Sequence, residues 1–331
     1  MQRLISVVTP CYNEELNVEE VAQRVRETFA AFPRYAYEHI FIDNASTDGT
    51  VKALKRIAAL DSHVRVIVNA RNFGHLRSPM HAMLEAGGDA TVLLFSDLQD
   101  PPELIARFIE EWEKGAPVVL GIRNSSAENG VIFWLRTRYY RLLNRLAHLE
   151  SYEHFSGFGL FDRSVIEIVR SFGDQYPYFR GMIAEIGLPH VKVFYAQGVR
   201  KRGVTKNNFY TLYDLAMLGV TNVSKVPLRL FTFFGFACSA LSVLVAVGYL
   251  AYKLLFWNRF SVGTAPVVIG LFFFASVQLA FIGVLSEYIA AIHTQVFKRP
   301  LVIERERVNF DREPAKIGSK GEASESAPNA E

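Results

Sequence analysis

The chain has 331 residues, of which 50% are hydrophobic and 21% are charged, and its mean hydropathy is +0.14. This length fits about two domains, and the composition is too apolar for a disordered chain and slightly too apolar for an ordinary soluble enzyme, so we expect part of the chain to lie in lipid. The 36 Lys and Arg residues against 33 Asp and Glu residues leave a net charge of +3, which argues against a nucleic-acid-binding protein that neutralises many phosphates.

The two cysteines, Cys11 and Cys238, are too few for a disulfide framework and lie in no Cys/His cluster that could hold a metal. We therefore expect the N-terminal region to face the cytoplasm. The apolar run at the start of the chain is short and soon interrupted by polar residues, which predicts that it is not a signal peptide.

Short apolar runs rich in β-branched residues alternate with helix-compatible stretches before residue 205. The apolar runs predict buried strands at residues 4–10, 38–43, 64–69, 90–97 and 116–122. Residues 15–32, 50–60 and 101–115 have helical spacing, and Asp48 and Asp100 lie near the expected starts of the second and third helices. This alternation predicts an α/β fold with a Rossmann-like, mostly parallel sheet, in which ligands bind beyond the carboxyl ends of the strands.

Polar residues follow three of the predicted strands, at residues 9–15, 42–50 and 95–105. Each segment alone is equally typical of a turn with helix-capping residues. Asp97 and Gln99 are two residues apart at a strand end, and we favour an interpretation in which they bind one Mg²⁺ or Mn²⁺ ion together with a substrate diphosphate. The alternative is helix capping, for which Asp100 is well placed before Pro101 and Pro102.

Two uncharged stretches follow, at residues 230–252 and 264–286. Each is long enough as a helix to cross a hydrocarbon core of ~30 Å, whereas buried helices of a soluble core are usually shorter and carry a polar stripe. The connection at 253–263 is too short to fold alone, so we expect a membrane hairpin with both ends on the cytoplasmic side. Basic residues flanking the hairpin favour this side: Lys225, Arg229, His293, Lys298, Arg299 and Arg305, opposed weakly by Lys253 and Arg259 in the connection.

Several motifs occur in an order and spacing that resemble the GT-A glycosyltransferases of family 2. They are Pro10, Tyr12, Asn13 and Glu14, then Asp43, then Arg71 to Gly74, then the segment from Asp97 to Ile105. The chain is most similar to the polyprenyl-phosphate glycosyltransferases of the dolichyl-phosphate mannose synthase type, which have C-terminal membrane helices. The resemblance runs from about residue 3 to residue 303 and includes residues 203–215 and 276–301.

Together with this resemblance, the patterns divide the chain into five parts. They are a GT-A catalytic domain at 1–205, juxtamembrane amphipathic helices at 206–229, two transmembrane helices within 230–286, an exit helix and C-terminal strand at 287–310, and a disordered tail at 311–331. The resemblance further implies a multi-pass protein of the cell inner membrane.

The resemblance also implies roles for individual residues. It implies that the nucleotide is contacted by Pro10, Tyr12, Glu14 and Asp43, and that a metal ion is bound by Asp97 and Gln99. A carboxylate such as Asp43 can accept from a uracil or guanine N–H, and the Tyr12 ring can stack or simply pack.

Three basic residues match phosphate-binding positions of the family. Arg200 and Lys206 match a basic loop that would act in catalysis, together with Asp97, by offsetting charge on the departing diphosphate. The alternative is a juxtamembrane basic cluster that touches anionic lipid. Arg123 matches an arginine that contacts the acceptor phosphate, with a surface salt bridge as the alternative.

The sequence departs from the family pattern at three places. Phe95 replaces the first acid of Asp-x-Asp, and Asn44 replaces an acid often found beside the position of Asp43. Residues 156–159 lack both the Asp and the Arg of the family's Thr-Gly-Asp-Phe-Arg stretch. A hydroxyl acceptor needs a general base, whereas a phosphate monoester is already anionic, so the missing Asp is compatible with a polyprenyl phosphate acceptor.

These observations predict an inverting glycosyltransferase that moves one sugar from a nucleotide diphosphate sugar to polyprenyl (undecaprenyl) phosphate at the cytoplasmic membrane face. By resemblance a UDP-sugar is preferred to GDP-mannose as the donor. The alternatives are transfer to a lipid or polysaccharide hydroxyl, and a catalytically silent nucleotide-sugar-binding homologue.

The helix expected to leave the membrane, Ser286–Lys298, has an amphipathic pattern. It fits an interfacial helix on lipid head groups or, as the resemblance favours, a helix packed against a neighbouring subunit or the catalytic domain. We therefore expect a symmetric homo-oligomer, with a tetramer as one form.

Overall fold

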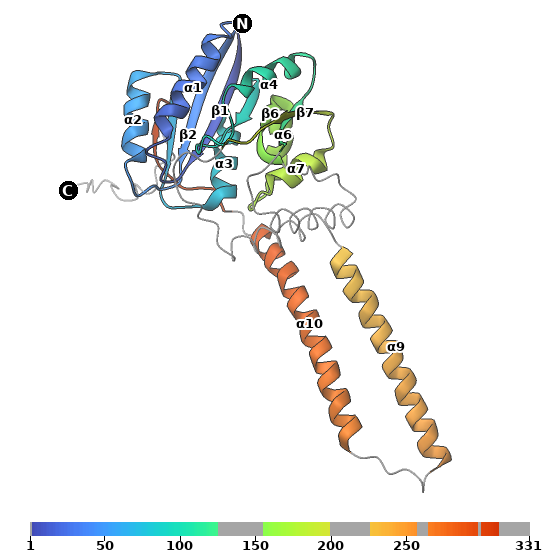
Figure 1. Cartoon of the computed structure of the whole chain (residues 1–331). Helices are drawn as coiled ribbons and strands as arrows, with labels where there is room; N and C mark the ends of the chain where they lie inside the picture. Colours follow the sequence, from blue (N-terminus) through green and yellow to red (C-terminus); the bar gives the residue numbers. More distant parts are fainter. Residues whose placement is uncertain (1, 125–154, 199–225, 257–263, 297–298, 311–331) are drawn as a thin grey trace, which may run out of the picture.

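The computed structural model describes residues 2–124, 155–198, 226–256, 264–296 and 299–310 (Figure 1). Its centre is an eight-stranded sheet with the strand order β7-β5-β6-β4-β1-β2-β3-β8. The strands are β1 (Arg3–Cys11), β2 (Tyr35–Asp43), β3 (Val64–Asn69), β4 (Ala90–Leu93), β5 (Val118–Arg123), β6 (Phe155–Asp162), β7 (His190–Tyr195) and β8 (Glu304–Val308).

The five predicted strands are confirmed as β1 to β5, although β4 ends at Leu93 rather than at residue 97. The pairs β1–β2, β1–β4, β2–β3 and β5–β7 are parallel. Strand β6 runs antiparallel between β4 and β5, and β8 runs antiparallel along β3. The sheet is therefore mixed but mostly parallel, and the carboxyl ends of β1 to β5 and β7 share one edge.

Helices cover both faces of the sheet. The predicted helices are confirmed as α1 (Val18–Ala30), α2 (Thr50–Leu60) and α4 (Leu104–Glu113), whose buried side chains share one core cluster with Phe41, Val66 and Phe158. The opposite face is covered by α3 (Gly74–Glu85), α6 (Arg163–Phe172) and α7 (Phe179–Ile186), which the sequence reasoning did not predict.

The two expected helix starts have different outcomes. Asp48 lies at the start of α2, where its carboxylate accepts a hydrogen bond from the Thr50 backbone N–H at 3.0 Å. The capping prediction for Asp100 is wrong, because α4 begins at Leu104, beyond hydrogen-bonding reach of a cap at position 100. The Asp100 carboxylate instead contacts Arg123 and Tyr195.

Two long helices occupy the apolar stretches: α9 (Val226–Leu255) and α10 (Thr264–Val296). They lie side by side and extend away from the sheet domain (Figure 1), and the rings of Phe234 and Phe281 stack between them at 6.2 Å. Within the described residues one helical window, Phe273–Ala290, is long and apolar enough to cross a membrane, with a mean hydropathy of 1.6. A span in α9 stays a prediction. The expected exit segment is helical as far as Val296, where it continues α10 without a break; its role stays a prediction.

The segment after α10 returns to the sheet domain and is fastened there by several contacts. Arg77 of α3 donates to the Pro300 carbonyl at 2.7 Å, and the Ala70 N–H donates to the Ile303 carbonyl at 2.8 Å. Strand β8 then pairs with β3, with Glu304 opposite Asn69 at the carboxyl end of β3. The end of α10 is therefore tied to the edge of the sheet where the predicted site lies.

Candidate active site

The loop after β1 is fixed to the loop after β2 by side chains. Asn13 has a left-handed backbone (φ 57°), its N–H donates to Ser46 Oγ at 2.8 Å, and its side-chain Oδ1 accepts from the Thr47 N–H at 2.8 Å. The Glu14 N–H donates to Thr50 Oγ1 at 2.8 Å. These bonds fix the loop that carries half-buried Pro10, Tyr12 and Glu14. The contacts of these three residues with a nucleotide stay a prediction.

Asp43 ends β2 directly beside Cys11 of β1 and is fully buried. Its Oδ2 accepts from the Ser46 N–H at 2.9 Å, whereas Oδ1 is buried without a hydrogen-bond partner in the described part of the chain. Burial raises the pKa of Asp43, and hydrogen bonds from Ser46 partly oppose this. A buried acceptor without a partner is costly, so Asp43 offers an oxygen suited to an N–H donor from a ligand.

Asn44 has a structural role, which accounts for the absence of an acid at this position. Its Nδ2 donates to Asn72 Oδ1 at 2.9 Å and to the Gly74 carbonyl at 3.1 Å. Its Oδ1 accepts from Asn69 Nδ2 at 3.2 Å and from the Phe73 N–H at 2.8 Å. Because an aspartate lacks donors, it could not make the first two bonds.

The loop after β4 carries the predicted metal ligands. Asp97 is half-buried, its Oδ1 accepts from the Gln99 N–H at 3.2 Å, and Leu98 between them has a left-handed backbone (φ 55°). Gln99 Oε1 accepts from Gln197 Nε2 at 2.9 Å, and an amide oxygen retains a second lone pair. Ser96 Oγ donates to the Pro10 carbonyl at 3.0 Å, which joins this loop to the loop after β1.

The described residues contain no group of three or more His, Cys, Asp or Glu side chains that could hold a metal ion. An ion at this loop would have the Asp97 carboxylate and the Gln99 amide oxygen as its protein ligands. Such a set of two oxygens fits Mg²⁺ or Mn²⁺ when a diphosphate and water supply the remaining ligands.

Two departures from the family pattern contact each other. Gly157 has φ +114°, and a Cβ on it would lie 3.5 Å from the Phe95 ring and 3.4 Å from Leu93. The next residue, Phe158, is fully buried against Phe108, with ring centroids 4.9 Å apart. Residues 157–159 are therefore packed in the interior, and residues 156–159 include no acidic or basic side chain that could act as a general base.

Arg123, at the end of β5, contacts a buried carboxylate. Its Nη2 donates to Asp100 Oδ1 at 3.0 Å and Oδ2 at 3.3 Å, and its Nε donates to Tyr195 Oη at 3.2 Å. The salt bridge that was the alternative for Arg123 is therefore present, but Asp100 is fully buried, so the pair lies in the interior rather than at the surface; the contact with an acceptor phosphate stays a prediction. Burial raises the pKa of Asp100, and the Arg123 charge opposes that rise.

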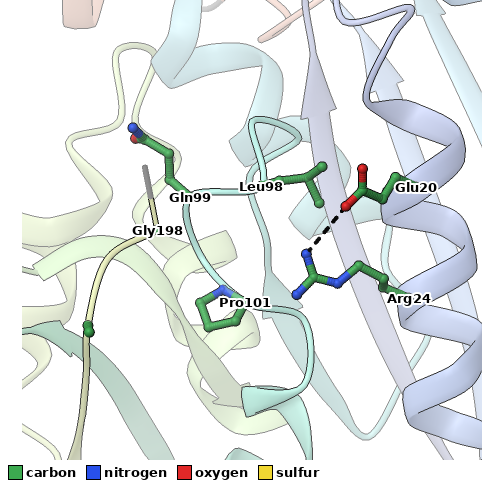
Figure 2. A pocket seen from close by; sticks show the side chains of 7 residues that line it. Glu20, Arg24, Leu98, Gln99, Pro101 and Gly198 are labelled. Carbon is green, nitrogen blue, oxygen red and sulfur yellow. Dashed lines mark ion pairs between the residues drawn. The ribbon is translucent and has the colours of Figure 1, made fainter. Parts of the chain in front are cut away.

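A pocket of about 590 Å³ lies beside the loop after β4, the loop that carries Asp97 and Gln99 (Figure 2). Glu20 and Arg24 of α1 form one side, where they make an ion pair at 3.8 Å, and Gln99 and Gly198 form the other. Gly198 ends the described segment after β7, and Arg200 and Lys206 lie outside the described residues.

The structure thus brings six predicted residues to one edge of the sheet, namely Pro10, Tyr12, Glu14, Asp43, Asp97 and Gln99, with Arg123 joined to the same edge through Asp100. Sequence reasoning missed Tyr195 and Gln197, because strand β7 was not predicted and neither residue belongs to a recognised motif. It found Asp100 but assigned it to the wrong partner.

Comparison with known proteins defines the class. Residues 6–169 match the model of the family "Glycosyl transferase family 2". The SfII prophage-derived bactoprenol glucosyl transferase of Shigella flexneri is 32% identical over 300 residues, covering 90% of this chain and 96% of that protein. The uncharacterized glycosyltransferase YkcC of Bacillus subtilis is 32% identical over 301 residues, covering 90% and 92%.

The chain therefore belongs to glycosyltransferase family 2 and is a glycosyltransferase. Among solved structures, the mannosyltransferase PcManGT of Pyrobaculum calidifontis, in complex with GDP-Man and Mn²⁺, is 18% identical with a TM-score of 0.45, covering 90% of this chain and 88% of that one.

Proposed function

We propose that this glycosyltransferase transfers a single sugar, with inversion, from a nucleotide diphosphate sugar to polyprenyl phosphate at the cytoplasmic membrane face, with a UDP-sugar as the donor. The observation that carries the proposal is the course of the chain after α10. The segment after this apolar helix is fixed to the edge of the sheet where the predicted nucleotide-binding residues lie. The contacts are those of Arg77 with Pro300 and of Ala70 with Ile303, and the pairing of Glu304 with Asn69. A lipid acceptor could therefore remain in the bilayer while its phosphate reaches the cleft.

The surfaces of α9 and α10 support a membrane position. Large apolar side chains are exposed along both helices, among them Leu244 at 69%, Leu271 at 67% and Leu279 at 68%. Water-exposed apolar surface on this scale is rare in a soluble monomer, and lipid would remove the cost. We place both helices across the membrane, with the catalytic domain at 1–205 and both chain ends in the cytoplasm.

In this mechanism the protein binds the diphosphate of the donor and the phosphate of the acceptor, and it holds the sugar between these two anions. Asp43, Pro10, Tyr12 and Glu14 bind the nucleotide, and Arg123 binds the acceptor phosphate. An acceptor phosphate oxygen attacks the anomeric carbon, the bond from that carbon to the diphosphate breaks, and the nucleoside diphosphate leaves with the electron pair.

No side chain has to remove a proton in this step, since a phosphate monoester is anionic at neutral pH. The apolar packing at Gly157 and Phe158 is therefore compatible with the reaction. Positioning and stabilisation of the leaving diphosphate supply the rate.

Asp97 and Gln99 would hold the Mg²⁺ or Mn²⁺ ion, which when bound neutralises charge on the diphosphate. By resemblance, Arg200 and Lys206 contribute to the same stabilisation. The protein is proposed to form a symmetric homo-oligomer through its membrane helices, with a tetramer as one form.

The proposal is tested by incubating the detergent-purified protein and Mn²⁺ with polyprenyl phosphate and a panel of radiolabelled nucleotide sugars. We expect a labelled glycolipid from one UDP-sugar. The absence of a glycolipid from every donor, or transfer only to hydroxyl lipids, would overturn the proposal.

A further inference from the structure

Three side chains from three separate elements form a closed hydrogen-bonded ring next to the loop after β4, which carries Asp97 and Gln99. Asp100 lies in the loop after β4, Arg123 ends β5, and Tyr195 ends β7. Arg123 Nη2 donates to both oxygens of Asp100, at 3.0 and 3.3 Å, and Arg123 Nε donates to Tyr195 Oη at 3.2 Å. Tyr195 Oη donates in turn to Asp100 Oδ1. Each side chain therefore restrains the other two.

The ring leaves one end of the guanidinium available. A guanidinium has five N–H donors in a rigid planar fork, and the bonds above use Nε and Nη2. Arg123 Nη1 donates no hydrogen bond to another of the described residues. The Arg123 side chain is 23% exposed, whereas the Asp100 side chain is 0% exposed, so the two Nη1 donors are the part of this ring suited to a ligand.

The ring is also fixed relative to the donor site. Asp100 lies three residues after Asp97 in the same loop, and Ser96 of that loop is hydrogen-bonded to Pro10. Arg123 is opposite Tyr195 in the parallel β5–β7 pair, and the Asn124 N–H donates to the Tyr195 carbonyl at 2.9 Å. The position of Arg123 is thus fixed on one side by the loop after β4, through Asp100, and on the other side by β7, through Tyr195.

We infer that Asp100 and Tyr195 are positioning residues, which orient Arg123 so that its Nη1 group receives the acceptor phosphate. The inference rests on the proposed function. An unrestrained arginine samples many rotamers and loses that freedom on binding, whereas in this protein the restraint is already in place before the phosphate arrives. Removal of the restraint should therefore weaken acceptor binding and leave donor binding unchanged.

The main test variant is Tyr195→Phe, which deletes the hydroxyl and keeps the ring that packs against Phe158 at 5.7 Å. Because a hydrogen bond to a charged group is lost, we expect the KM for polyprenyl phosphate to rise roughly tenfold and the KM for the nucleotide sugar to change less than twofold. The matched control is Tyr37→Phe, which removes another half-buried hydroxyl facing a carboxylate, that of Asp61, from the early part of β2.

A double-mutant cycle separates positioning from general structural support. If Tyr195 acts through Arg123, the Tyr195→Phe change should have no further effect on acceptor KM in an Arg123→Ala background. Asp100→Asn, which keeps the shape of the side chain and removes its charge, should raise acceptor KM at least as much as Tyr195→Phe. Thermal unfolding of each variant identifies any that fail to fold, and Tyr195→Phe is the variant expected to retain the wild-type midpoint.

The outcomes separate the two proposals. A selective rise in acceptor KM that disappears in the Arg123→Ala background supports the positioning role. Wild-type acceptor KM for Tyr195→Phe, or an equal rise in donor and acceptor KM, overturns it and leaves the proposed function standing. A wild-type protein that glycosylates no polyprenyl phosphate overturns both.

Discussion

Replacing Glu304 by Gln should loosen the segment that fastens α10 to the sheet domain. The Glu304 carboxylate accepts from His81 Nε2 at 2.5 Å and from Arg307 Nη2 at 2.6 Å, and its side chain is only 8% exposed. Arg307 also pairs with Glu85 at 2.9 Å. Glutamine retains the size of the side chain but removes the charge on which both partners depend.

The magnitude follows from the pKa of this group. Contacts with His81 and Arg307 outweigh the opposing effect of burial and lower the pKa of Glu304 from 4.5 to about 2. At about 1.4 kcal/mol per pKa unit this corresponds to about 3.5 kcal/mol at most. Because solvent screens part of the interaction, we expect a loss of about 1–2 kcal/mol. The stabilisation is complete above pH 4.5 and is lost as the pH falls toward 2.

The assay is the thermal unfolding midpoint of the detergent-purified protein between pH 3 and pH 8. Glu304→Gln should lower Tm by about 2–5 °C at pH 7, and the difference from wild type should shrink in acid. Glu306→Gln is the matched control, since Glu306 lies in the same strand and pairs with Lys55 at 2.6 Å on an exposed surface, where a pair contributes about 0–1 kcal/mol. Equal effects of the two variants, or a pH-independent effect of Glu304→Gln, would refute the reasoning.

Three further predictions concern the site and its support. Asp97→Ala should abolish turnover and Asp97→Asn should leave little, as measured by glycolipid formation; full wild-type activity in excess chelator would contradict the metal role. Gly159→Ala should destabilise the protein by roughly 2–4 kcal/mol, because the added Cβ would lie 2.4 Å from the Val119 carbonyl; an unchanged unfolding midpoint would contradict the packing described. Arg200→Ala and Lys206→Ala should reduce kcat more than donor affinity, measured by steady-state kinetics and calorimetry; unchanged kcat would assign both residues to lipid contact.

The sequence predicted the parts of the fold that depend on local pattern. Strands β1 to β5 are buried apolar runs, and α1, α2 and α4 have apolar residues at helical spacing. The C-terminal strand expected within residues 287–310 is β8, but that expectation came from the family resemblance, because the sequence of β8, Glu304–Val308, is mostly charged and has no local strand signal. Strand β8 is held by its antiparallel pairing with β3 and by ion pairs with residues more than 200 positions away, such as Lys55 with Glu306, and these contacts exist only in the folded chain.

In the site, too, the features set by local sequence pattern could be predicted, and those set by contacts between distant residues could not. Motif residues such as Asp43 and Asp97 are at the ends of predicted strands, so their common location at one edge of the sheet could be inferred. The partner of Asp100 could not be inferred, because Tyr195 is 95 positions away and comes from a strand in which only two of six residues, Val193 and Tyr195, are buried. A local pattern could suggest only the nearest use of Asp100, as a helix cap.

The most direct test of the central claim is the bond formed in the product. The protein should be incubated with undecaprenyl phosphate and a UDP-sugar labelled with ¹³C at the anomeric carbon, and the purified glycolipid examined by NMR. We predict that the labelled carbon couples to ³¹P and has the anomeric configuration opposite to that of the donor. A glycolipid whose labelled carbon shows no coupling to phosphorus, or retains the donor configuration, would contradict the account.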